Sequence, residues 1–412
     1  MIPLPLDELR GLGLGRLEGD AAEITGVQID SRRVVAGDLF VALDGGAAFL
    51  EDARARGAAA TLVPEDGHTA MAALGRAVRD RSDARVVAIT GSVGKTSTKD
   101  ILAALLRRHR RVVAAEEGFN NEIGLPLTLC RIEPDTEIVV TEMAMRGLGQ
   151  IRALARTARP ELGVITSIAP VHLALLGSIE NVARAKAELL EELPAGATAI
   201  LPAEASELDP FVPQGLDLRR VAAPPVEIRD GRAHVGFRGR EVVFSFAARH
   251  QAGNAAVALE TCAALGVPLP EEPVEVTFSR WRSQERDLPG GGLLINDAWN
   301  SNPVALHAAL AYLRERAGGR RTVAILGDMA ELGAEAARFH EEAGREAAGL
   351  GLVLGVGELA RHFHPDEWVA TSAEAVEIAR ELVRPGDAVL VKGSRAVGLE
   401  VVAAALAEVT VP

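Results

Sequence analysis

The residues with the clearest chemistry lie in the stretch "VVAITGSVGKTST", residues 86–98. A short apolar run is followed there by a glycine-rich turn and by a segment compatible with a helix from about Thr96 to Arg108, which is the order that a phosphate-binding loop needs. Backbone N–H groups of the turn and the positive end of the helix would hold phosphate oxygens. Lys95 would reach the β- and γ-phosphates, and the Thr96 hydroxyl would bind Mg²⁺.

The spacing "TGSVGKT" gives a shorter loop than the common pattern, because Ile89 stands where that pattern has its first glycine. The alternative interpretation is a glycine turn followed by a surface lysine. We favour the phosphate loop because strand, glycines, lysine, threonine and helix all occur in the required order.

Two further polar side chains follow expected strands. The strand at 138–141 ends at Glu142, and a strand near 162–166 leads into a loop that carries His172. Ligands of open α/β sheets bind at the carboxyl ends of strands, and a carboxylate at that place is suited to Mg²⁺. The alternatives are a solvated glutamate at a strand end and a structural histidine.

Lys186 lies in the stretch "SIENVARAKAELLEELPAG", where Ser178 is a good N-cap residue. It shares one helical stripe with Val182 and Leu189, so the pattern predicts that it faces inward. A buried cation is costly unless it is paired or chemically altered. The alternative is that the stem packs while the amine reaches water.

Composition narrows the class of protein. A chain of 412 residues predicts two or three domains, and a net charge of −13 argues against nucleic acid as the main partner. The two cysteines, Cys130 and Cys262, are expected to be reduced thiols packed in helices. The start of the chain does not resemble a signal peptide, and no uncharged apolar run is long enough to span a membrane, so we expect a cytoplasmic protein. Of 44 basic residues only four are lysine, and Lys99 is expected to be a solvated helix residue.

Alternating strands and helices predict an α/β protein of three domains, with limits at 1–82, 83–278 and 279–412. The first is a small α/β unit, the second contains the phosphate loop, and the third is a doubly wound, parallel unit. Local patterns predict a turn at Asp30-Ser31-Arg32, which could bind phosphate or sugar or be a plain turn, and a polar loop at 119–126. They also predict an antiparallel pair of strands at 232–237 and 240–246 and a helix that starts after Gly253, with Asn254 in its first turn. Residues 280–303 are expected to form a polar, glycine-rich link into another strand.

Taken together, these motifs resemble the Mur ligases of peptidoglycan synthesis, over essentially the whole chain. The matching stretches are "IDSRRVVAGDLFVAL", "ITGSVGKTS", "NNEIGLPLTL", "TEMAMRGLGQI", "SIAPVHLALLGSIENVARAKAELL", "NDAWNSNP", "LGDMAELG" and "VLVKGSR". The resemblance implies a UDP-substrate domain, a central ATPase domain with a mainly parallel sheet, and a C-terminal Rossmann-like domain that closes over the site. It implies a monomeric ligase that uses ATP to join D-alanyl-D-alanine to UDP-N-acetylmuramoyl-tripeptide.

The resemblance also implies roles for particular residues. The catalytic set would be Lys95, Glu142, His172, Lys186, Arg282 and Asp297. ATP would be bound by Gly91, Ser92, Val93, Gly94, Lys95, Thr96, Ser97, Asn254, Arg282, Asp297, Trp299 and Asn300. Two Mg²⁺ ions would be held by Thr96, Glu142, His172 and a carbamylated Lys186. The other substrates would contact Ser31, Arg32, Asn120, Asn121, Asn302, Lys392 and Arg395.

This chain departs from the family pattern in three places. It reads "NDAWNSNP" where relatives often have D-D-S-Y-N-A-N-P, so Trp299 keeps the ring for stacking on adenine but two hydroxyls are lost. The stretch "ALDGGAAFLEDA" lacks the longer Asp-Gly-His loop near the uridine end, and Val93 replaces a small residue.

Three alternative functions would require different sequence features. A sister Mur-type or folylpolyglutamate-type ligase that adds a single amino acid would carry a D-N-P-R motif or folate-type loops, and neither is evident. A nucleotide switch that hydrolyses ATP would not need Glu142, His172 and Lys186. A catalytically idle binding protein would not need Lys95 and Thr96.

Overall fold

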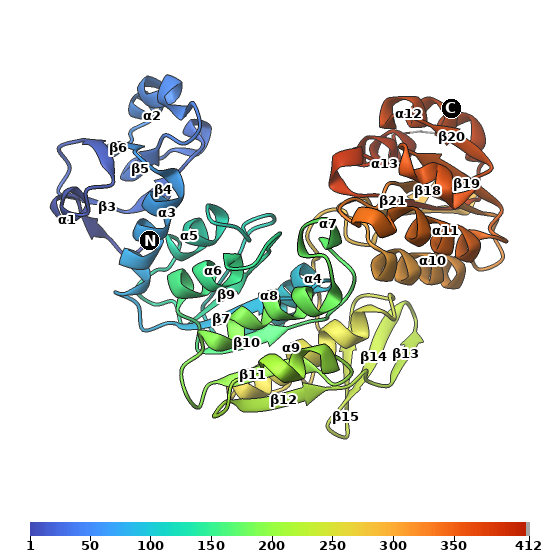
Figure 1. Ribbon diagram of the computed structural model, residues 1–412, viewed down its shortest axis with the longest axis horizontal. Coiled ribbons are helices and arrows are strands. Elements are labelled where there is room, and N and C mark those ends of the chain that lie inside the picture. The colour runs from blue at the N-terminus through green and yellow to red at the C-terminus, as the bar shows by residue number, and fades with distance from the viewer. Residues whose placement is uncertain (409–412) are drawn as a thin grey trace.

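The computed structural model describes residues 1–408, in which three α/β units follow one another along the long axis of the molecule (Figure 1). The first and last units lie at opposite ends, on either side of the central unit. Residues 409–412, the end of the predicted third domain, lie outside the described residues. No helix within 1–408 is long and apolar enough to cross a membrane.

The N-terminal unit is built on a four-stranded sheet with the order β2-β6-β5-β4, in which only the β2–β6 pair is antiparallel. Asp66 begins the long helix α3, because its side chain accepts a hydrogen bond from the backbone N–H of Thr69 at 2.6 Å. The elements are β1 Leu4–Pro5, α1 Leu6–Gly11, β2 Gly15–Glu18, β3 Glu23–Ile24, β4 Gly26–Gln28, β5 Asp38–Val41, α2 Leu50–Ala55, β6 Ala60–Pro64 and α3 Gly67–Arg79.

The central unit contains a fully parallel six-stranded sheet with the order β12-β11-β10-β7-β9-β8, next to an antiparallel sheet β13-β14-β15. The predicted antiparallel pair is therefore confirmed as β14 and β15. The elements are β7 Arg85–Thr90, α4 Lys95–Leu106, β8 Val112–Ala114, α5 Gly124–Leu129, β9 Ile138–Glu142, α6 Gln150–Ala158, β10 Leu162–Ile165, α7 Leu173–Leu176, α8 Ile179–Glu191, β11 Thr198–Pro202, β12 Asp217–Val221, β13 Val226–Arg229, β14 Arg232–Phe237, β15 Arg240–Phe244 and α9 Gln251–Ala264.

The C-terminal unit has a six-stranded sheet with the order β16-β17-β21-β18-β19-β20, parallel except for the edge strand β16. Residues 280–303 were predicted to form a polar link that leads into a strand. That prediction was wrong for residues 284–288, which form the edge strand β16. Charged side chains along β16 suit an exposed sheet edge. The elements are β16 Gln284–Leu288, β17 Gly292–Asp297, α10 Pro303–Ala317, β18 Thr322–Gly327, α11 Ala336–Ala347, β19 Leu352–Val356, β20 Glu367–Val369, α12 Ser372–Leu382, β21 Ala388–Lys392 and α13 Glu400–Ala407.

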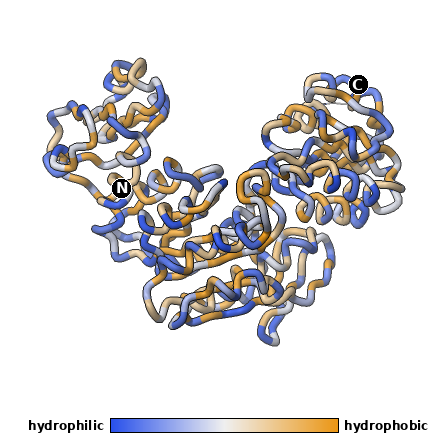
Figure 2. Tube along the Cα trace, viewed as in Figure 1, coloured by the Kyte–Doolittle hydropathy of each residue, from blue (hydrophilic) through white to orange (hydrophobic). Residues whose placement is uncertain are grey.

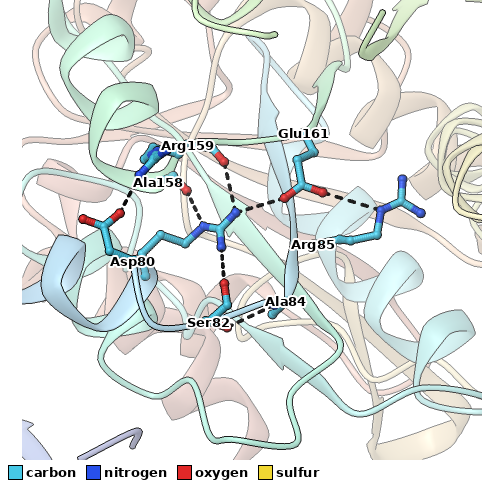
Figure 3. A network of polar contacts seen from close by, with 8 residues as sticks. Asp80, Ser82, Ala84, Arg85, Ala158, Arg159 and Glu161 are labelled. Carbon is cyan, nitrogen blue, oxygen red and sulfur yellow. Dashed lines mark hydrogen bonds and ion pairs between the residues drawn. The ribbon is translucent and has the colours of Figure 1, made fainter. Parts of the chain in front are cut away.

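Apolar and polar contacts join the first two units. One hydrophobic core extends from α3 through α5 and α6. Figure 2 shows that hydrophobic and hydrophilic stretches alternate along the chain in all three units. A Cβ at Gly75 of α3 would lie 2.9 Å from the Cα of Pro126, so the two helices meet closely. Arg79 donates to the carbonyl of Ala158, at the end of α6, at 3.1 Å and to the carboxylate of Glu161 at 3.0 Å (Figure 3). Arg79 thus satisfies carbonyl groups at a helix end while it connects the units.

Two other local predictions were wrong. Helix α9 begins at Gln251, before Gly253, because a glycine in the first turn does not interrupt the helix: N–H groups of the first turn have no partner within a helix. Residues 124–126 of the predicted polar loop belong to α5, where the side chain of Asn121, three residues before the helix, accepts from the backbone N–H of Gly124 at 2.8 Å.

Candidate active site

The glycine-rich turn joins β7 to α4 and depends on close approaches that only glycine allows. Gly91 has φ 149°, and a Cβ there would lie 2.0 Å from the hydroxyl of Thr166. Gly94 has φ 85°, and its Cβ would lie 2.3 Å from the side-chain oxygen of Asn254. Both glycines therefore fix the loop against neighbouring segments as well as permitting its backbone conformation.

Hydroxyl side chains that follow β10 hold this loop. The hydroxyl of Ser167 accepts from the backbone N–H of Val93 at 2.8 Å, and that of Thr166 donates to the Val93 carbonyl at 2.5 Å. Ser92 donates to the carbonyl of Ala169 at 3.1 Å. We missed Thr166 and Ser167 in the sequence, although two hydroxyl residues directly after a buried strand were a usable signal.

Lys95 and Thr96 begin α4 directly after the loop. The Lys95 amine donates to the carbonyl of Gly91 at 2.7 Å. Burial lowers the pKa of Lys95, the charge of Glu142 opposes that change, and the charge of Arg282 adds to it. Arg282 donates to the Thr96 hydroxyl at 3.3 Å, so an arginine just before the first strand of the C-terminal sheet, β16, reaches the phosphate loop.

The loop opens onto a cavity of about 250 Å³ between the central and C-terminal units. It collects most of the residues predicted to bind ATP, together with His250, Gln251 and Ser283, which the sequence did not single out. The predicted residues that line it are Ser92, Val93, Gly94, Lys95, Thr96, Ser97, Asn254, Arg282, Asp297, Asn300, Asn302 and Lys392.

The C-terminal wall of the cavity is organised by Asp297, at the end of β17. Its carboxylate accepts from the amine of Lys392 at 2.6 Å and from the backbone N–H of Ser283 at 3.0 Å. Lys392, only 2% exposed, also donates to the carbonyl of Asn300 at 2.9 Å. Two of the three N–H donors of this buried lysine thus bind groups of the wall, and Asp297 connects the interdomain link to strand β21.

Parallel strand pairing places Glu142, and the segment that carries His172, near the phosphate loop. Ile89 of β7 pairs with Glu142 at the end of β9, and β10 pairs with β7 on its other side. Glu142 is buried and accepts from the side-chain amide of Asn120 at 2.9 Å, so the solvated alternative is excluded. His172 immediately precedes α7, and its Nδ1 contacts the carboxylate of Glu331 from the C-terminal unit.

Lys186 faces inward from α8, whose N-cap is Ser178 as predicted. It is 2% exposed, which argues against the alternative of an amine that extends into bulk water, and it forms no hydrogen bond or ion pair with residues 1–408. Burial lowers its pKa well below the ordinary value, and the charge of Lys95 lowers it further. Burial is also the main cause that lowers the pKa of His172, to which the charges of Lys186 and Lys95 contribute. Lys95, His172 and Lys186 therefore lie within electrostatic range of one another, and Glu142 lies within range of Lys95.

The predicted metal ligands do not form a metal site by conventional residues alone. In the described part of the chain, no three histidine, cysteine, aspartate or glutamate side chains lie together so that they could hold a metal ion. Glu142 and His172 are two such side chains, and Thr96 adds a hydroxyl. Mg²⁺ prefers oxygen ligands, so the fit depends on whether Lys186 gains oxygen atoms.

Trp299 does not line the cavity. Its ring lies 6.0 Å from that of Trp281, and the guanidinium of Arg395 lies 4.6 Å from the Trp281 ring and 5.7 Å from the Trp299 ring. Arg282 lies 5.5 Å from the Trp299 ring on the cavity side. Arg395 also pairs with Glu400. Two arginines and two indoles thus form one stack between the interdomain link and the C-terminal unit.

The remaining predicted substrate residues have structural partners of their own. Ser31 and Arg32 lie in the N-terminal unit, in a 3-10 turn capped by Asp30, and do not line the cavity. Arg32 is exposed and binds the Asp30 carboxylate with two nitrogens, at 2.9 and 2.7 Å. Asn121 accepts from the first N–H of α5 as described above, and Asn302 is the N-cap of α10 and accepts from a backbone N–H at 2.9 Å.

Comparison with known proteins gives consistent matches along the chain. Three family models match: "Mur ligase family, catalytic domain" at residues 23–110, "Mur ligase middle domain" at 89–212, and "Mur ligase, glutamate ligase domain" at 281–395. The UDP-N-acetylmuramoyl-tripeptide–D-alanyl-D-alanine ligase of Synechocystis sp. is 32% identical over 423 residues, which cover 93% of this chain and 92% of the relative.

Solved structures agree with these matches. A crystal structure of MurF from Acinetobacter baumannii aligns with a TM-score of 0.86 and 26% identity, covering 98% of this chain and 99% of that one. The MurF ligase from Thermotoga maritima, in complex with ADP, aligns with a TM-score of 0.79 and 25% identity, covering 93% and 97%.

Proposed function

The chain belongs to the Mur ligase family, and we propose that it joins D-alanyl-D-alanine to UDP-N-acetylmuramoyl-tripeptide with ATP. The observation that carries this proposal is the near full-length similarity to ligases named for that reaction. The cavity beside the phosphate loop supports it, because basic side chains from two units converge there. The α/β fold of three units is the one expected for such an enzyme.

The proposed reaction has two steps. An oxygen of the peptide carboxylate attacks the γ-phosphorus of ATP, the bond to ADP breaks, and an acyl phosphate forms. The amine nitrogen of D-alanyl-D-alanine then attacks the acyl carbon, phosphate leaves, and the nitrogen loses a proton. Lys95 and Arg282 supply the positive charge beside the transferring group, so this chain contributes mainly positioning and electrostatic stabilisation. Closure of the units would exclude water from the acyl phosphate.

We propose that Thr96, Glu142, His172 and Lys186 hold Mg²⁺, in two sites. When bound, the ions would neutralise charge on the phosphates. Lys186 fits the role only after its amine reacts with CO₂ to give a carbamate and a proton, since the carbamate supplies anionic oxygens. Deep burial, the absence of a partner within 1–408 and a lowered pKa all favour the neutral amine that this addition requires.

Other assignments follow from the same proposal. ATP would occupy the cavity against the loop residues 91–97, Asn254, Arg282, Asp297 and Asn300, with adenine on Trp299 after closure. The UDP-linked peptide and the dipeptide would contact Ser31, Arg32, Asn120, Asn121, Asn302, Lys392 and Arg395. We propose domain limits at 1–82, 83–278 and 279–412, and a monomer that acts in the cytoplasm.

The experiment is phosphate release from ATP by the purified full chain with Mg²⁺. Release is expected only when UDP-N-acetylmuramoyl-tripeptide and D-alanyl-D-alanine are both present. Release with a single amino acid in place of the dipeptide would transfer the protein to a sister ligase. Release that needs neither substrate would indicate a nucleotide switch, and none under any condition would overturn the assignment as an enzyme.

A further inference from the structure

One segment of the C-terminal unit, residues 328–333, contacts the central unit beside His172, and we call this segment the docking loop. The backbone N–H of Ala174, in α7, donates to the carbonyl of Glu331 at 3.1 Å. The Glu331 carboxylate contacts Nδ1 of His172 and lies 3.4 Å from Nε of Arg146. Both of these side chains belong to the central unit, so Glu331 bridges the two units.

The backbone conformation of the docking loop allows it to lie close against α7. Glu331 has φ 64°, a left-handed backbone that a glutamate rarely adopts without support from its surroundings. Gly333 has φ 63°, and a Cβ there would lie only 3.1 Å from the Cα of Ala174. The approach of the loop to α7 is therefore as close as the backbone allows.

The other side of the docking loop is held inside the C-terminal unit. The hydroxyl of Ser394 accepts from the backbone N–H of Ala330 at 2.8 Å, and Nε2 of the buried His340 accepts from that of Met329 at 2.9 Å. Ser394 lies two residues after Lys392, which belongs to the wall of the nucleotide cavity. The position of Glu331 is therefore linked to that wall through a short, rigid segment.

An ionised carboxylate only accepts hydrogen bonds, so its contact with Nδ1 requires that nitrogen to carry the proton. The other nitrogen, Nε2, is then the one with a free lone pair. Histidines that bind metals commonly donate their second N–H to a carboxylate, which fixes the ring orientation and the tautomer. Here the carboxylate comes from a different unit than the histidine.

We propose that Glu331 is a positioning residue for His172, and that docking of the C-terminal unit on α7 sets the orientation and tautomer of that histidine. The consequence for catalysis rests on the proposed ligase function, whereas the positioning itself does not. The competing interpretation is an interdomain ion pair that contributes only to stability.

The test compares Glu331→Ala and Glu331→Gln with a matched control, Glu335→Ala. Glu335 lies four residues further on and is exposed, and within residues 1–408 the one side chain that its carboxylate pairs with is that of Arg338. Histidines labelled with ¹⁵N are observed by NMR, and the His172 signals are assigned by their loss in His172→Gln. Mn²⁺ binding to the full chain without nucleotide is measured by electron paramagnetic resonance.

We expect His172 in the wild type and in Glu335→Ala to show a single tautomer with the proton on Nδ1. Glu331→Ala should show a mixture of tautomers and bind Mn²⁺ about tenfold or more weakly. Glu331→Gln should lie between them, because its amide oxygen still accepts. Gly333→Ala, which leaves the carboxylate intact but displaces the loop from Ala174, should reproduce the loss.

The proposal is overturned if Glu331→Ala matches Glu335→Ala in both the His172 signals and Mn²⁺ binding. A parallel assay of phosphate release separates the two proposals. Wild-type protein without ligase activity would overturn the proposed function, while the NMR comparison would still decide whether Glu331 positions His172. With ligase activity present, we expect Glu331→Ala to lower kcat and raise the Mg²⁺ concentration needed for half-maximal rate.

Discussion

Lys186→Met should make the ligand-free protein more stable, although it removes a residue proposed to be essential for activity. Lys186 is 2% exposed as a residue, and its amine has no hydrogen-bond or ion-pair partner within residues 1–408. The charge of Lys95 acts on it as a repulsion. Methionine has a similar shape and no charge, so the substitution keeps the packing and removes the cost of burying the amine.

The magnitude follows from proton linkage. A lysine amine has a pKa of about 10.4 in an unfolded chain, and each unit by which folding lowers it costs about 1.4 kcal/mol. At pH 7 the cost cannot exceed about 4.6 kcal/mol, because an amine whose folded pKa lies below 7 is already neutral in the folded protein, and folding then costs only the loss of its proton at pH 7. We therefore expect Lys186→Met to raise the free energy of unfolding by about 1 to 4 kcal/mol. Because the pKa of Lys186 is lowered on folding, wild-type stability should rise with pH up to about 10.4, and the advantage of the variant should shrink over that range.

Lys99→Met provides the matched control, since Lys99 is also buried, at 4% exposure, but pairs with Asp100. Removing that amine leaves a carboxylate without its cation and should cost about 3 to 5 kcal/mol. Both variants are compared with the wild type by urea denaturation in carbonate-free buffer, followed by circular dichroism. Added bicarbonate should stabilise the wild type and not Lys186→Met, because only a primary amine forms a carbamate. A loss of stability in Lys186→Met similar to that in Lys99→Met would refute the reasoning.

Three further predictions concern other parts of the chain. Gly94→Ala should weaken binding of a non-hydrolysable ATP analogue about tenfold or more in calorimetry, since its Cβ would lie 2.3 Å from a side-chain oxygen on α9 and its φ is 85°. Gly118→Ala, with φ 78° and open space around it, is the control and should bind normally. Burial lowers the pKa of His340, so below about pH 6.5 the unfolded chain binds a proton more readily than the folded protein does. Between pH 7.5 and 5.5 the free energy of unfolding, measured by urea denaturation, should therefore fall by up to about 1.4 kcal/mol more in the wild type than in His340→Gln. Burial raises the pKa of both Cys130 and Cys262 to about 12, so mass spectrometry should find neither thiol alkylated by iodoacetamide at pH 8 unless urea is added.

The parts of the site that the sequence predicted depend on short-range patterns. The phosphate loop, the strand that ends at Glu142 and the cap at Ser178 each need only a few neighbouring residues to be recognised. The inward orientation of Lys186 followed from helical spacing alone, because one apolar stripe of α8 had to face the sheet. The chemistry of these residues could therefore be proposed before their neighbours were known.

The parts that the sequence did not reveal depend on packing between distant segments. Lys99 was expected to be solvated, but α9 packs against α4, the lysine is buried, and it pairs with the adjacent Asp100. Thr166 and Ser167 hold the phosphate loop across a strand pairing that no local pattern specifies. Glu331 reaches His172 from a position 159 residues later in the chain. Contacts of this kind have no period along the sequence, so they required the structure.

The link between the central and C-terminal units carries two unfavourable features that a bound nucleotide would relieve or use. Trp281 and Ser283 have φ 56° and 49°, which is costly for residues other than glycine. Between them, Nε of Arg282 is buried and has no hydrogen-bond partner among residues 1–408, although its Nη2 donates to Thr96. A phosphate oxygen in the cavity would accept from that nitrogen and convert a cost of folding into binding energy. Because the same link begins the unit that carries Glu331, occupation of the nucleotide cavity and placement of His172 are expected to depend on one conformation of this short segment.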